Sequence, residues 1–521
     1  VGYTLTDVSP IDNRLHELNM EDNQWRAKRK AILKYVLKRT QELNPDMNVT
    51  IDDVMAFDEK ILPVLDFRIW NKEIITELRQ REDVRYVDPM GYSMAPDKTP
   101  QKSGSGCGSN TGDNNIPSAD YTTQAPNNAK IPWNYNYMNI PQAWTRSNGS
   151  GITVGLIDTG VGSGQAKLGS QFASGYSTGR SIYKYGTYTS SWWCWGGCSP
   201  DGPNDQCGHG TQMAGLIAAP RSGPSSTGVA YKANLVSYRG TGDVIINSSN
   251  EKKGVSNALT GLGNRSDVRI ISMSIGDVFS NSRVRDAVRY AYGRGKMIVA
   301  AGGTSTNFTT WYGVIFPASM SETVAVTGVK EGQYNKCDVC HTGSAIDFTV
   351  QMQRTNGTSN KVPVLSYYNG LENYVGGSSV ATATTAGIAA LVWSKHPTWS
   401  RAQVLQKILM DSWTLEKEDK DMIVMQHKFG YEYQGEKHQI ESSMTVIGED
   451  QTYTAMAKTV GLPVAIATLL ILNKKITTTG VQIPITKEVY EPILNELENH
   501  GIVFTEIKTP YLGYNPDIVI G

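Results

Sequence analysis

The chain has 521 residues, which is too long for one typical domain and suits two to four. Lysine plus arginine equals aspartate plus glutamate, at 49 each, so no global field favours a nucleic acid, a membrane or an acidic partner. Fifty-one glycines and a hydrophobic fraction of 39% are typical of a loop-rich globular enzyme and argue against a fibrous or disordered chain. The longest apolar run, Gly461 to Leu472, is well short of the roughly 20 residues that a membrane helix needs.

The first 92 residues read as a small α+β module. The sequence predicts a basic amphipathic helix, two strands, a second helix and a last short strand. In chain order these are Asp22–Leu43, Asn48–Phe57, Ile61–Ile69, Asn71–Arg81 and Val84–Val87. The order makes a small sheet with helices on one face, so residues 1–92 are expected to be self-contained.

A polar stretch rich in glycine, serine and proline follows, at residues 93–117. Such a stretch is typical of an exposed linker that a protease cuts. We expect a maturation cut within it, near Pro96 to Gly104.

Residues 118–410 are expected to form a second domain, because predicted strands alternate with predicted helices there. The predicted elements are Ile152–Ile157, Gly210–Ile217, Ala233–Tyr238, Gly254–Leu262, Val268–Ile275, Asn281–Gly293, Met297–Ala301 and Val324–Val329. Such alternation predicts an α/β fold with a mostly parallel sheet, helices on both faces, and ligands beyond the carboxyl ends of the strands. A Trp/Cys-rich excursion at Ser191–Cys198 is expected to be a pinned surface loop.

The composition and the pattern of predicted elements change again near residue 411. A charged patch at Glu416–Asp421 is followed by β-rich pieces at Met422–Tyr433 and Gln439–Ile447 and by an apolar helix. We therefore treat residues 411–521 as a separate α+β region.

Three residues lie at positions where such a fold carries functional side chains, at the end of a strand or the start of a helix. Asp158 ends a buried strand, His209 stands between glycines at the start of a helix, and Ser379 opens a second, apolar helix after a glycine-rich turn. Each has an ordinary explanation on its own, as a turn former, a core histidine and a helix N-cap. Their common position and the order Asp, His, Ser favour a catalytic triad, with a carboxylate that orients the histidine.

At this point the chain resembles the subtilase family of serine peptidases. The resemblance lies in Asp158-Thr-Gly160, Gly208-His-Gly-Thr211 and Gly377-Ser-Ser-Val-Ala381, and it spans roughly residues 130–410. It implies a subtilisin-like fold, with Ser379 as the nucleophile, His209 as general base and acid, and Asp158 as the group that fixes the imidazole tautomer. Met273-Ser274-Ile275-Gly276 looks like the family's strand that pairs with the backbone of an extended substrate.

One departure from the family concerns the oxyanion hole. Where the family has Ala-Ala-Gly-Asn, this chain has Ala300-Ala301-Gly302-Gly303, so the asparagine amide is absent. In subtilisin that loss costs about 10² to 10³ in turnover. We expect the Ser379 backbone N–H to remain and Thr304 or Ser305 to supply a hydroxyl. A catalytically silent, peptide-binding fold is the alternative.

The resemblance also implies a propeptide, partners and cofactor requirements for the enzyme. The module at 1–92, which ends in Glu82-Asp-Val-Arg-Tyr-Val-Asp88, looks like the family's inhibitory and chaperoning propeptide, so the chain is expected to be a zymogen. The expected partners are a polypeptide substrate and the chain's own propeptide, with no nucleic acid and no membrane. No cofactor is required for catalysis, and structural calcium fits the family.

Cysteine usage points to the compartment. The chain begins at Val1 without methionine or leader, so a signal peptide has been removed or the sequence is partial. An even number of cysteines in short loops favours disulfides and an oxidising compartment, with the pairing left open. They are Cys107, Cys194, Cys198, Cys207, Cys337 and Cys340. We expect a secreted or extracytoplasmic protein.

Two short motifs are similar to motifs of other functional classes. Cys337-Asp-Val-Cys340-His341 matches the pattern for covalent haem attachment, but in a polar loop we favour a local disulfide. The glycines at 160, 162 and 164 do not have the spacing of a dinucleotide-binding loop.

The tail carries a second resemblance, over roughly residues 419–506. The stretches 419–429, 456–466 and 480–487 are similar to the C-terminal segment of saccharopine dehydrogenases. In that family the nucleotide fold lies upstream, and no such fold is expected here. The resemblance implies a fused remnant without dehydrogenase activity. An enzyme of lysine metabolism is the less favoured third alternative.

Overall fold

The computed structural model divides the chain into two compact units, Val1–Leu405 and Gln406–Gly521. The structure describes all residues except 7–9, 93–106, 108–111, 113–115, 126, 192–197, 306–312, 356–358, 414–419, 451, 481–482 and 512–521, together with the side chains of 409–413. Most of the predicted linker and of the Trp/Cys-rich loop therefore lies outside the described residues. The predicted domain boundaries at 92, 117 and 410 stay predictions.

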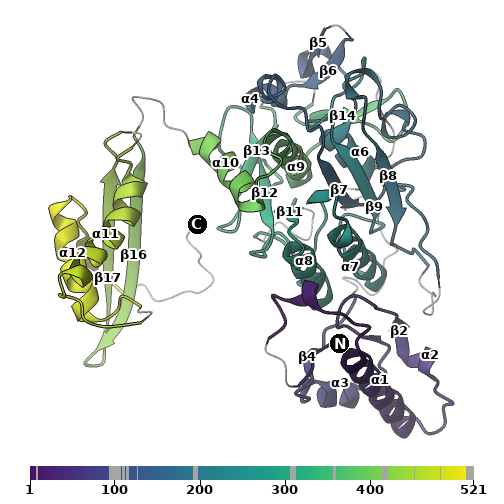
Figure 1. The fold of residues 1–521 in the computed structure, drawn as a ribbon, viewed down its shortest axis with the longest axis horizontal. Coiled ribbons are helices and arrows are strands. Elements are labelled where there is room, and N and C mark those ends of the chain that lie inside the picture. The colour runs from purple at the N-terminus through teal and green to yellow at the C-terminus, as the bar shows by residue number, and fades with distance from the viewer. Residues whose placement is uncertain are drawn as a thin grey trace. The chain divides into compact units, whose positions relative to one another are not determined.

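A seven-stranded parallel sheet forms the centre of the first unit (Figure 1). Its strands run in the order β13-β12-β11-β10-β7-β9-β8, and every neighbouring pair is parallel. They are β7 (Thr153–Asp158), β8 (Ile182–Gly186), β9 (Asn234–Arg239), β10 (Val268–Met273), β11 (Met297–Ala301), β12 (Val324–Lys330) and β13 (Phe348–Gln353). The inner strands are buried on both faces, which explains their nearly continuous runs of valine, isoleucine and alanine.

Helices cover both faces of this sheet. Helices α6 (His209–Ala218) and α9 (Ser378–Lys395) pack together on one face, and α7 (Ser249–Asn264) and α8 (Ser282–Gly293) pack together on the other (Figure 1). The predicted α/β architecture is confirmed. Most of α9 is buried, as its run of small and apolar residues indicates.

Smaller elements frame this domain. They are η2 (Ser118–Asp120), β5 (Tyr121–Gln124), β6 (Ala129–Pro132), α4 (Asn134–Tyr137), α5 (Ile140–Ala143), η3 (Ala166–Leu168), η4 (Gly175–Ser177), β14 (Val362–Leu365), β15 (Glu372–Val375) and α10 (Arg401–Trp413). The antiparallel pairs β5–β6 and β14–β15 stand apart from the central sheet.

The N-terminal module has both predicted helices, but its strands are shorter than expected. Its elements are β1 (Gly2–Tyr3), η1 (Leu15–Glu17), α1 (Asn23–Leu43), α2 (Ile51–Val54), β2 (Met55–Phe57), β3 (Asp66–Phe67), α3 (Lys72–Arg79) and β4 (Val84–Tyr86). The strand predicted at 48–57 is wrong in part, because Thr50 and Asp53 form a capping box that starts a helical turn. The strand predicted at 61–69 is paired only at β3.

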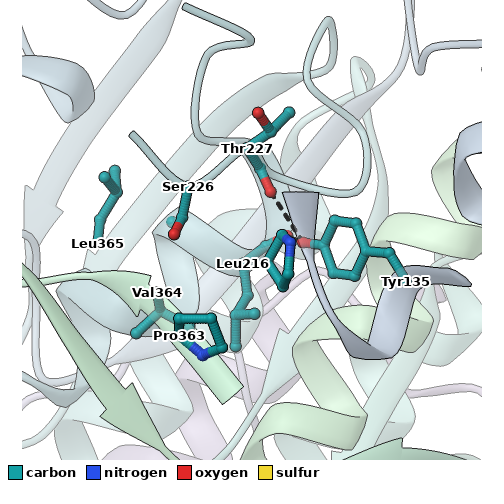
Figure 2. A pocket seen from close by; sticks show the side chains of 9 residues that line it. Tyr135, Leu216, Ser226, Thr227, Pro363, Val364 and Leu365 are labelled. Carbon is teal, nitrogen blue, oxygen red and sulfur yellow. Dashed lines mark hydrogen bonds between the residues drawn. The ribbon is translucent and has the colours of Figure 1, made fainter. Parts of the chain in front are cut away.

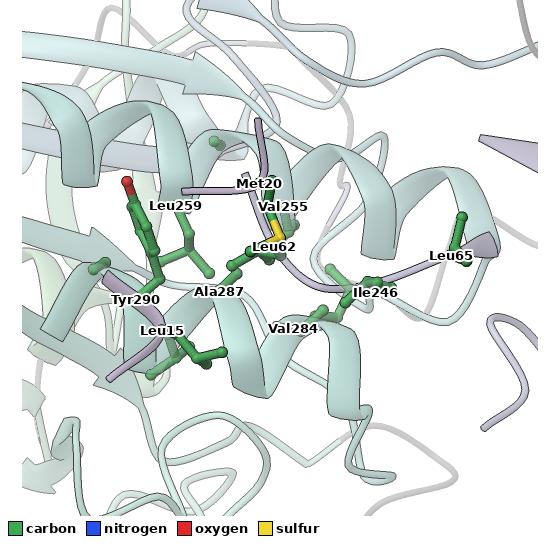
Figure 3. Close-up of a cluster of buried hydrophobic side chains, with 14 of the residues drawn as sticks. Leu15, Met20, Leu62, Leu65, Ile246, Val255, Leu259, Val284, Ala287 and Tyr290 are labelled. Atoms are coloured by element: carbon green, nitrogen blue, oxygen red, sulfur yellow. The ribbon is translucent and has the colours of Figure 1, made fainter. Parts of the chain in front are cut away.

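The N-terminal module shares a hydrophobic core with the outer faces of α7 and α8. Leu15, Met20, Leu62 and Leu65 of the module lie among apolar side chains of the sheet domain (Figure 3). The facing residues are Ile246, Val255, Leu259, Val284, Ala287 and Tyr290. Since buried apolar area stabilises at about 25 cal/mol per Å², the module is held by the same effect that holds a domain core.

Ion pairs add to this contact along α8. Arg283 donates to Glu59 and to Asp66, and all three side chains are nearly inaccessible to solvent. Arg85 of the module donates to both carboxylate oxygens of Asp286, at 2.7 and 3.0 Å. The helix therefore presents alternating charges to a module that carries the opposite ones.

The second unit is a three-stranded antiparallel sheet with helices. It contains β16 (Met422–Tyr433), β17 (Glu436–Ile447), the π-helical turn η5 (Ala457–Gly461), α11 (Leu462–Leu472), α12 (Lys487–Asn499) and β18 (Thr505–Thr509). The strand order is β16-β17-β18. Met444 and Val446 of β17 pack with Ile466 and Leu497 of the two helices. The α+β character predicted for the tail is confirmed.

Two disulfides link described cysteines. Cys337 pairs with Cys340, which confirms the local disulfide that we favoured there, and Cys107 pairs with Cys207. The second bond attaches the predicted linker two residues before His209. Among the helices that the structure describes, none is long and apolar enough to cross a membrane.

Candidate active site

Asp158 and His209 meet where the end of β7 faces the start of α6. The Nδ1 atom of His209 lies 2.8 Å from Oδ1 of Asp158. The close approach needs glycine on both sides, because a Cβ on Gly210 would lie 2.3 Å from the carbonyl oxygen of Gly160. Both side chains are buried, at 5% exposure for His209 and 0% for Asp158.

Among the described residues, the Asp158 carboxylate accepts hydrogen bonds through only one of its oxygens. Oδ1 receives the Thr159 N–H at 2.8 Å and the Thr159 hydroxyl at 3.3 Å as well as the contact with His209. Oδ2 is buried and has no hydrogen-bond partner among the described residues. A buried carboxylate is stable only when it is hydrogen-bonded or paired, so the bonds to Thr159 and His209 together hold the charge in place.

Asp205 is a residue that the sequence reasoning missed. Its carboxylate is fully buried and accepts from the backbone N–H groups of Cys207, Gly208 and Thr211 at 2.8 to 2.9 Å. It also binds the hydroxyls of Thr159 and Thr211. Asp205 thereby ties the turn before α6 to the turn after β7. Gly208 is the N-cap residue of α6, and Asp205 lies outside that position, so no helix-capping pattern in the sequence marked it.

Ser379 lies in the first turn of α9, next to the segment that follows β10. Its hydroxyl donates to the carbonyl oxygen of Ser274 at 3.4 Å, and the Ser274 hydroxyl donates to the carbonyl of Ser379 at 3.1 Å. Helices α6 and α9 are packed together, so the two helix starts belong to one layer. No hydrogen bond joins Ser379 to His209 among those of the described residues; unliganded enzymes often show this bond long or poorly aligned.

The residues that follow Ser274 run beside a second backbone segment. Gly276 donates its N–H to Val244 O and accepts from Ile246 N, both at 3.0 Å. A Cβ on Gly276 would lie 2.6 Å from the carbonyl oxygen of Phe316. Ile275 is buried, with 1% exposure.

The loop after β11 holds the turn that precedes Ser379. Gly303 donates its N–H to the Ser378 hydroxyl at 3.1 Å, and the Thr304 hydroxyl accepts from Ser378 N at 3.1 Å. Ser305 donates its N–H to the carbonyl of Val339. Gly303 and Thr304 therefore lie one residue from the candidate nucleophile, and the Thr304 hydroxyl is engaged with the turn itself.

The ring of His341 occupies the space that a side chain at position 303 would need. A Cβ on Gly303 would lie 2.5 Å from His341 Nδ1, and the φ of Gly303 is +124°, a conformation that other residues rarely adopt. The ring is fixed by a 2.9 Å hydrogen bond from Nδ1 to the carbonyl of Gly313, and the backbone N–H of His341 donates to Gly303 O at 2.9 Å. A side chain at 303 would thus collide with the imidazole of His341.

The electrostatics of His209 are set by two opposing effects. Burial disfavours the charged ring, but the carboxylates of Asp158, Asp205 and Asp243, with Asp158 the largest of them, together outweigh it and raise the pKa of His209 above its ordinary value of 6.5. Burial lowers the pKa of His341 instead, so His341 is neutral at pH values where His209 becomes charged.

The kcat/KM of the enzyme is expected to depend on the protonation of His209. A general base must be neutral, so kcat/KM is expected to fall as the pH decreases through the raised pKa of His209, with a midpoint above 6.5. The measurement is a pH profile of kcat/KM on a peptide without titrating groups in this range. In Asp158→Asn the midpoint is expected to move down. A wild-type midpoint at or below 6.5 would contradict the assignment.

No metal cluster competes with this site in the described part of the chain. No group of three or more His, Cys, Asp or Glu residues that could hold a metal ion is found there. A small cavity lies beneath α6, where the Tyr135 hydroxyl donates to Thr227 O at 2.9 Å (Figure 2). Its lining is apart from the candidate triad: Pro132, Tyr135, Gly215, Leu216, Ser226, Thr227, Pro363, Val364 and Leu365.

Comparison with known proteins gives several serine peptidases. Thermitase from Thermoactinomyces vulgaris is 28% identical over 53% of this chain and 86% of its own length. Alkaline elastase YaB from Bacillus sp. (strain YaB) is 30% identical over 53% of this chain and 63% of its own length. Subtilisin from Bacillus sp. (strain TA39) is 27% identical over 55% of this chain and 67% of its own length. Among solved structures, Sphericase covers 53% of this chain and 88% of its own, at 22% identity and a TM-score of 0.39.

These relatives define the class as a serine endopeptidase, which is a hydrolase. Within that class the chain resembles the subtilisin-like peptidases, as the three motifs indicated. Those relatives need no cofactor for catalysis.

A second match concerns the tail. The model of the saccharopine dehydrogenase C-terminal domain matches residues 258–502. The predicted resemblance at the C-terminus is confirmed. The match begins earlier than expected, inside α7, where the chain forms part of the parallel sheet domain.

Proposed function

We propose that the chain is a zymogen of a serine endopeptidase that hydrolyses peptide bonds in extended polypeptides. The hydrogen-bonded pair of Asp158 and His209, at 2.8 Å, is the observation that carries this proposal. With Nδ1 engaged by the carboxylate, the other ring nitrogen of His209 is left for the nucleophile.

In the proposed mechanism His209 moves one proton. As Oγ of Ser379 adds to the substrate carbonyl, its proton passes to Nε2 of His209, and the Asp158 carboxylate stabilises the resulting imidazolium. His209 then protonates the leaving amine, which frees the new amino end and leaves an acyl-enzyme. A water molecule repeats the sequence and releases the acid.

The start of α9 supplies one donor for the oxyanion. Ser378 N donates to the Thr304 hydroxyl and Val380 N donates to Gly377 O, whereas no acceptor for the N–H of Ser379 is found among the described residues. The positive end of the helix dipole adds to it. We propose that Gly303, Thr304 and Ser305 form the opposite wall, and that Ser274, Ile275 and Gly276 align the substrate.

We propose that residues 1–92 are the inhibitory propeptide. The shared core with α7 and α8 and the paired charges of Arg85 and Asp286 support this proposal. Secretion is proposed with it. A relative from Bacillus subtilis (strain 168), 28% identical over 65% of this chain and 44% of its own length, is described as a minor extracellular protease. Two disulfides in the described residues suit an oxidising compartment. The amino-terminal sequence of the mature protein would locate the cut.

The second prediction tests the nucleophile. After separation from residues 1–92, the protein is expected to hydrolyse an unfolded protein substrate and to take up a fluorophosphonate on Ser379, because the helix start and His209 activate that hydroxyl. Mass spectrometry of the labelled peptide is the measurement, and Ser379→Ala is the control that should show neither activity nor label.

The alternative is a peptide-binding protein without activity, which the missing amide at Gly303 favours. Absence of both hydrolysis and label, with retained affinity for unfolded protein, would establish this alternative and overturn the enzyme mechanism.

A further inference from the structure

Strand β16 is an edge of the sheet in the second unit (Figure 1). The sheet order is β16-β17-β18, so no described strand pairs with the other edge of β16. All residues of β16 are exposed except Ile423, which is half-buried. On an edge strand, alternate N–H and C=O groups point away from the sheet and are available to another strand. The free edge of β16 is 12 residues long, whereas native proteins keep such edges short.

The edge of β16 lacks most of the features that keep free edges from pairing. The strand contains no proline, and it pairs with β17 from Met422 to Tyr433 without a bulge. The turn that follows has Gln434 and Gly435 at φ values of +53° and +81°, as a two-residue hairpin turn requires. Such a turn fixes the register of the hairpin, so the edge is regular over its whole length.

The half of β16 next to the turn carries exposed aromatic side chains. Phe429, Tyr431 and Tyr433 are 53%, 38% and 62% exposed. They share a sheet face with Met444 and Val446, whose packing against the helices covers the opposite end of the hairpin. A row of large exposed apolar side chains marks a surface that another chain covers.

The charges of β16 determine which partner fits this edge. Two copies of one edge pair antiparallel around a two-fold axis, and each residue meets the one that lies equally far on the other side of the axis. Lys428 and Glu432 lie equally far from Gly430, so an axis at Gly430 sets each opposite the other in the second copy. An axis at Lys428 opposes two lysines, and an axis at Phe429 gives neither charge an opposite charge.

The same axis extends charge pairs that already exist within each hairpin. Glu432 is paired with Lys437 of β17, and Lys428 is paired with Glu441. Nζ of Lys428 lies 3.1 Å from Oε1 of Glu441. Joining two copies at Gly430 therefore gives one row of alternating charges across both hairpins. The row is Lys437 and Glu432 of one copy, followed by Lys428 and Glu441 of the second copy.

The axis at Gly430 also matches the aromatic side chains on the other face. It places Phe429 of one copy opposite Tyr431 of the second copy. It places His427 opposite Tyr433 in the same way. Aromatic cross-strand pairs stabilise antiparallel sheets, and here they select the register that the charges select.

We propose that the chain forms a dimer of two identical copies, in which the β16 edges pair antiparallel about a two-fold axis at Gly430. The pairing joins two three-stranded sheets into one continuous sheet. This inference concerns the second unit and does not rest on the proposed function. Each dimer carries two candidate active sites.

The test measures the oligomeric state of the full chain with Ser379→Ala, which prevents self-cleavage. Sedimentation velocity at concentrations up to about 100 μM is expected to show a dimer. Glu432→Lys alone and Lys428→Glu alone each set like charges opposite each other twice per dimer, so each is expected to raise the Kd of the dimer about tenfold or more. An equal mixture of the two variants is expected to dimerise again, because both cross-strand contacts of the mixed dimer are Lys–Glu pairs.

The mixture separates the interface from folding, since a defect inside one hairpin is the same with and without the other variant. Glu491→Lys is the matched control, because it reverses an exposed carboxylate of α12 that pairs with Lys487, and it is expected to leave the Kd unchanged. A Ser379→Ala chain that stays monomeric over this range would overturn the inference. So would an unchanged Kd in both single variants, or a mixture that dimerises no better than either variant alone.

Discussion

Replacing His209 by alanine is expected to lower kcat of the matured enzyme about 10⁶-fold, and adding Asp158→Ala is expected to lower it no further. The physical reason is that the described protein contacts of the Asp158 carboxylate are confined to Thr159 and His209. Once the imidazole is gone, the carboxylate has no catalytic group to orient. Asp158→Ala alone is expected to cost about 10⁴-fold, because a misoriented histidine still takes some protons.

The measurement is kcat under saturating substrate for the two single variants and the double variant. Asp201→Asn is a suitable control, since this nearby carboxylate contacts Arg239 and Ser190 rather than His209. A double variant whose loss equals the product of the single losses would show that Asp158 acts independently of His209, and would contradict the proposed triad.

Arg283→Met is expected to destabilise the uncut chain by about 3 to 5 kcal/mol. The substitution leaves Glu59 and Asp66 as buried carboxylates without their cation, and their side chains are 5% and 1% exposed. The loss falls on the contact between the module and α8, so early release of the module is expected as well. Denaturant unfolding of the Ser379→Ala chain measures the change without self-cleavage.

Two further variants isolate the buried charge. Arg285→Met, on the same helix, removes only a contact with the Ser282 hydroxyl and should cost far less. The triple change of Arg283→Met with Glu59→Gln and Asp66→Asn should recover most of the stability, because no unpaired charge remains. Equal losses for Arg283→Met and Arg285→Met would show that the ion pairs contribute little.

The sequence predicted the parts of the fold that local patterns determine. Strand β7 and helix α9 have patterns of apolar residues long enough to identify, and the turns at Asp158 and Ser379 are marked by glycine. The segment at 48–57 was harder, since its apolar residues suit a strand while Thr50 and Asp53 cap a helix. Local capping decided the conformation there.

The contacts that complete the candidate site depend on residues distant in sequence. Gly303 meets a histidine 38 positions later, and Ser379 meets Ser274. Periodicity carries no information about such pairs, so the sequence offers Thr304 and Ser305 as oxyanion donors and does not indicate that Thr304 binds the turn at Ser378. Asp205 belongs to the same group, because it binds the hydroxyl of Thr159, 46 positions earlier in the chain.

We expect substitutions at Gly303 and His341 to depend on each other. An asparagine at 303 meets the imidazole of His341 at 2.5 Å and a backbone φ of +124° that suits glycine. Asparagine at 303 therefore requires a smaller residue at 341 and a relaxed loop before its amide is of use. The effects of the two substitutions are expected to be non-additive, as for any residues in direct contact. A single substitution at 303 meets both obstacles at once, so we expect Gly303→Asn alone to lower activity.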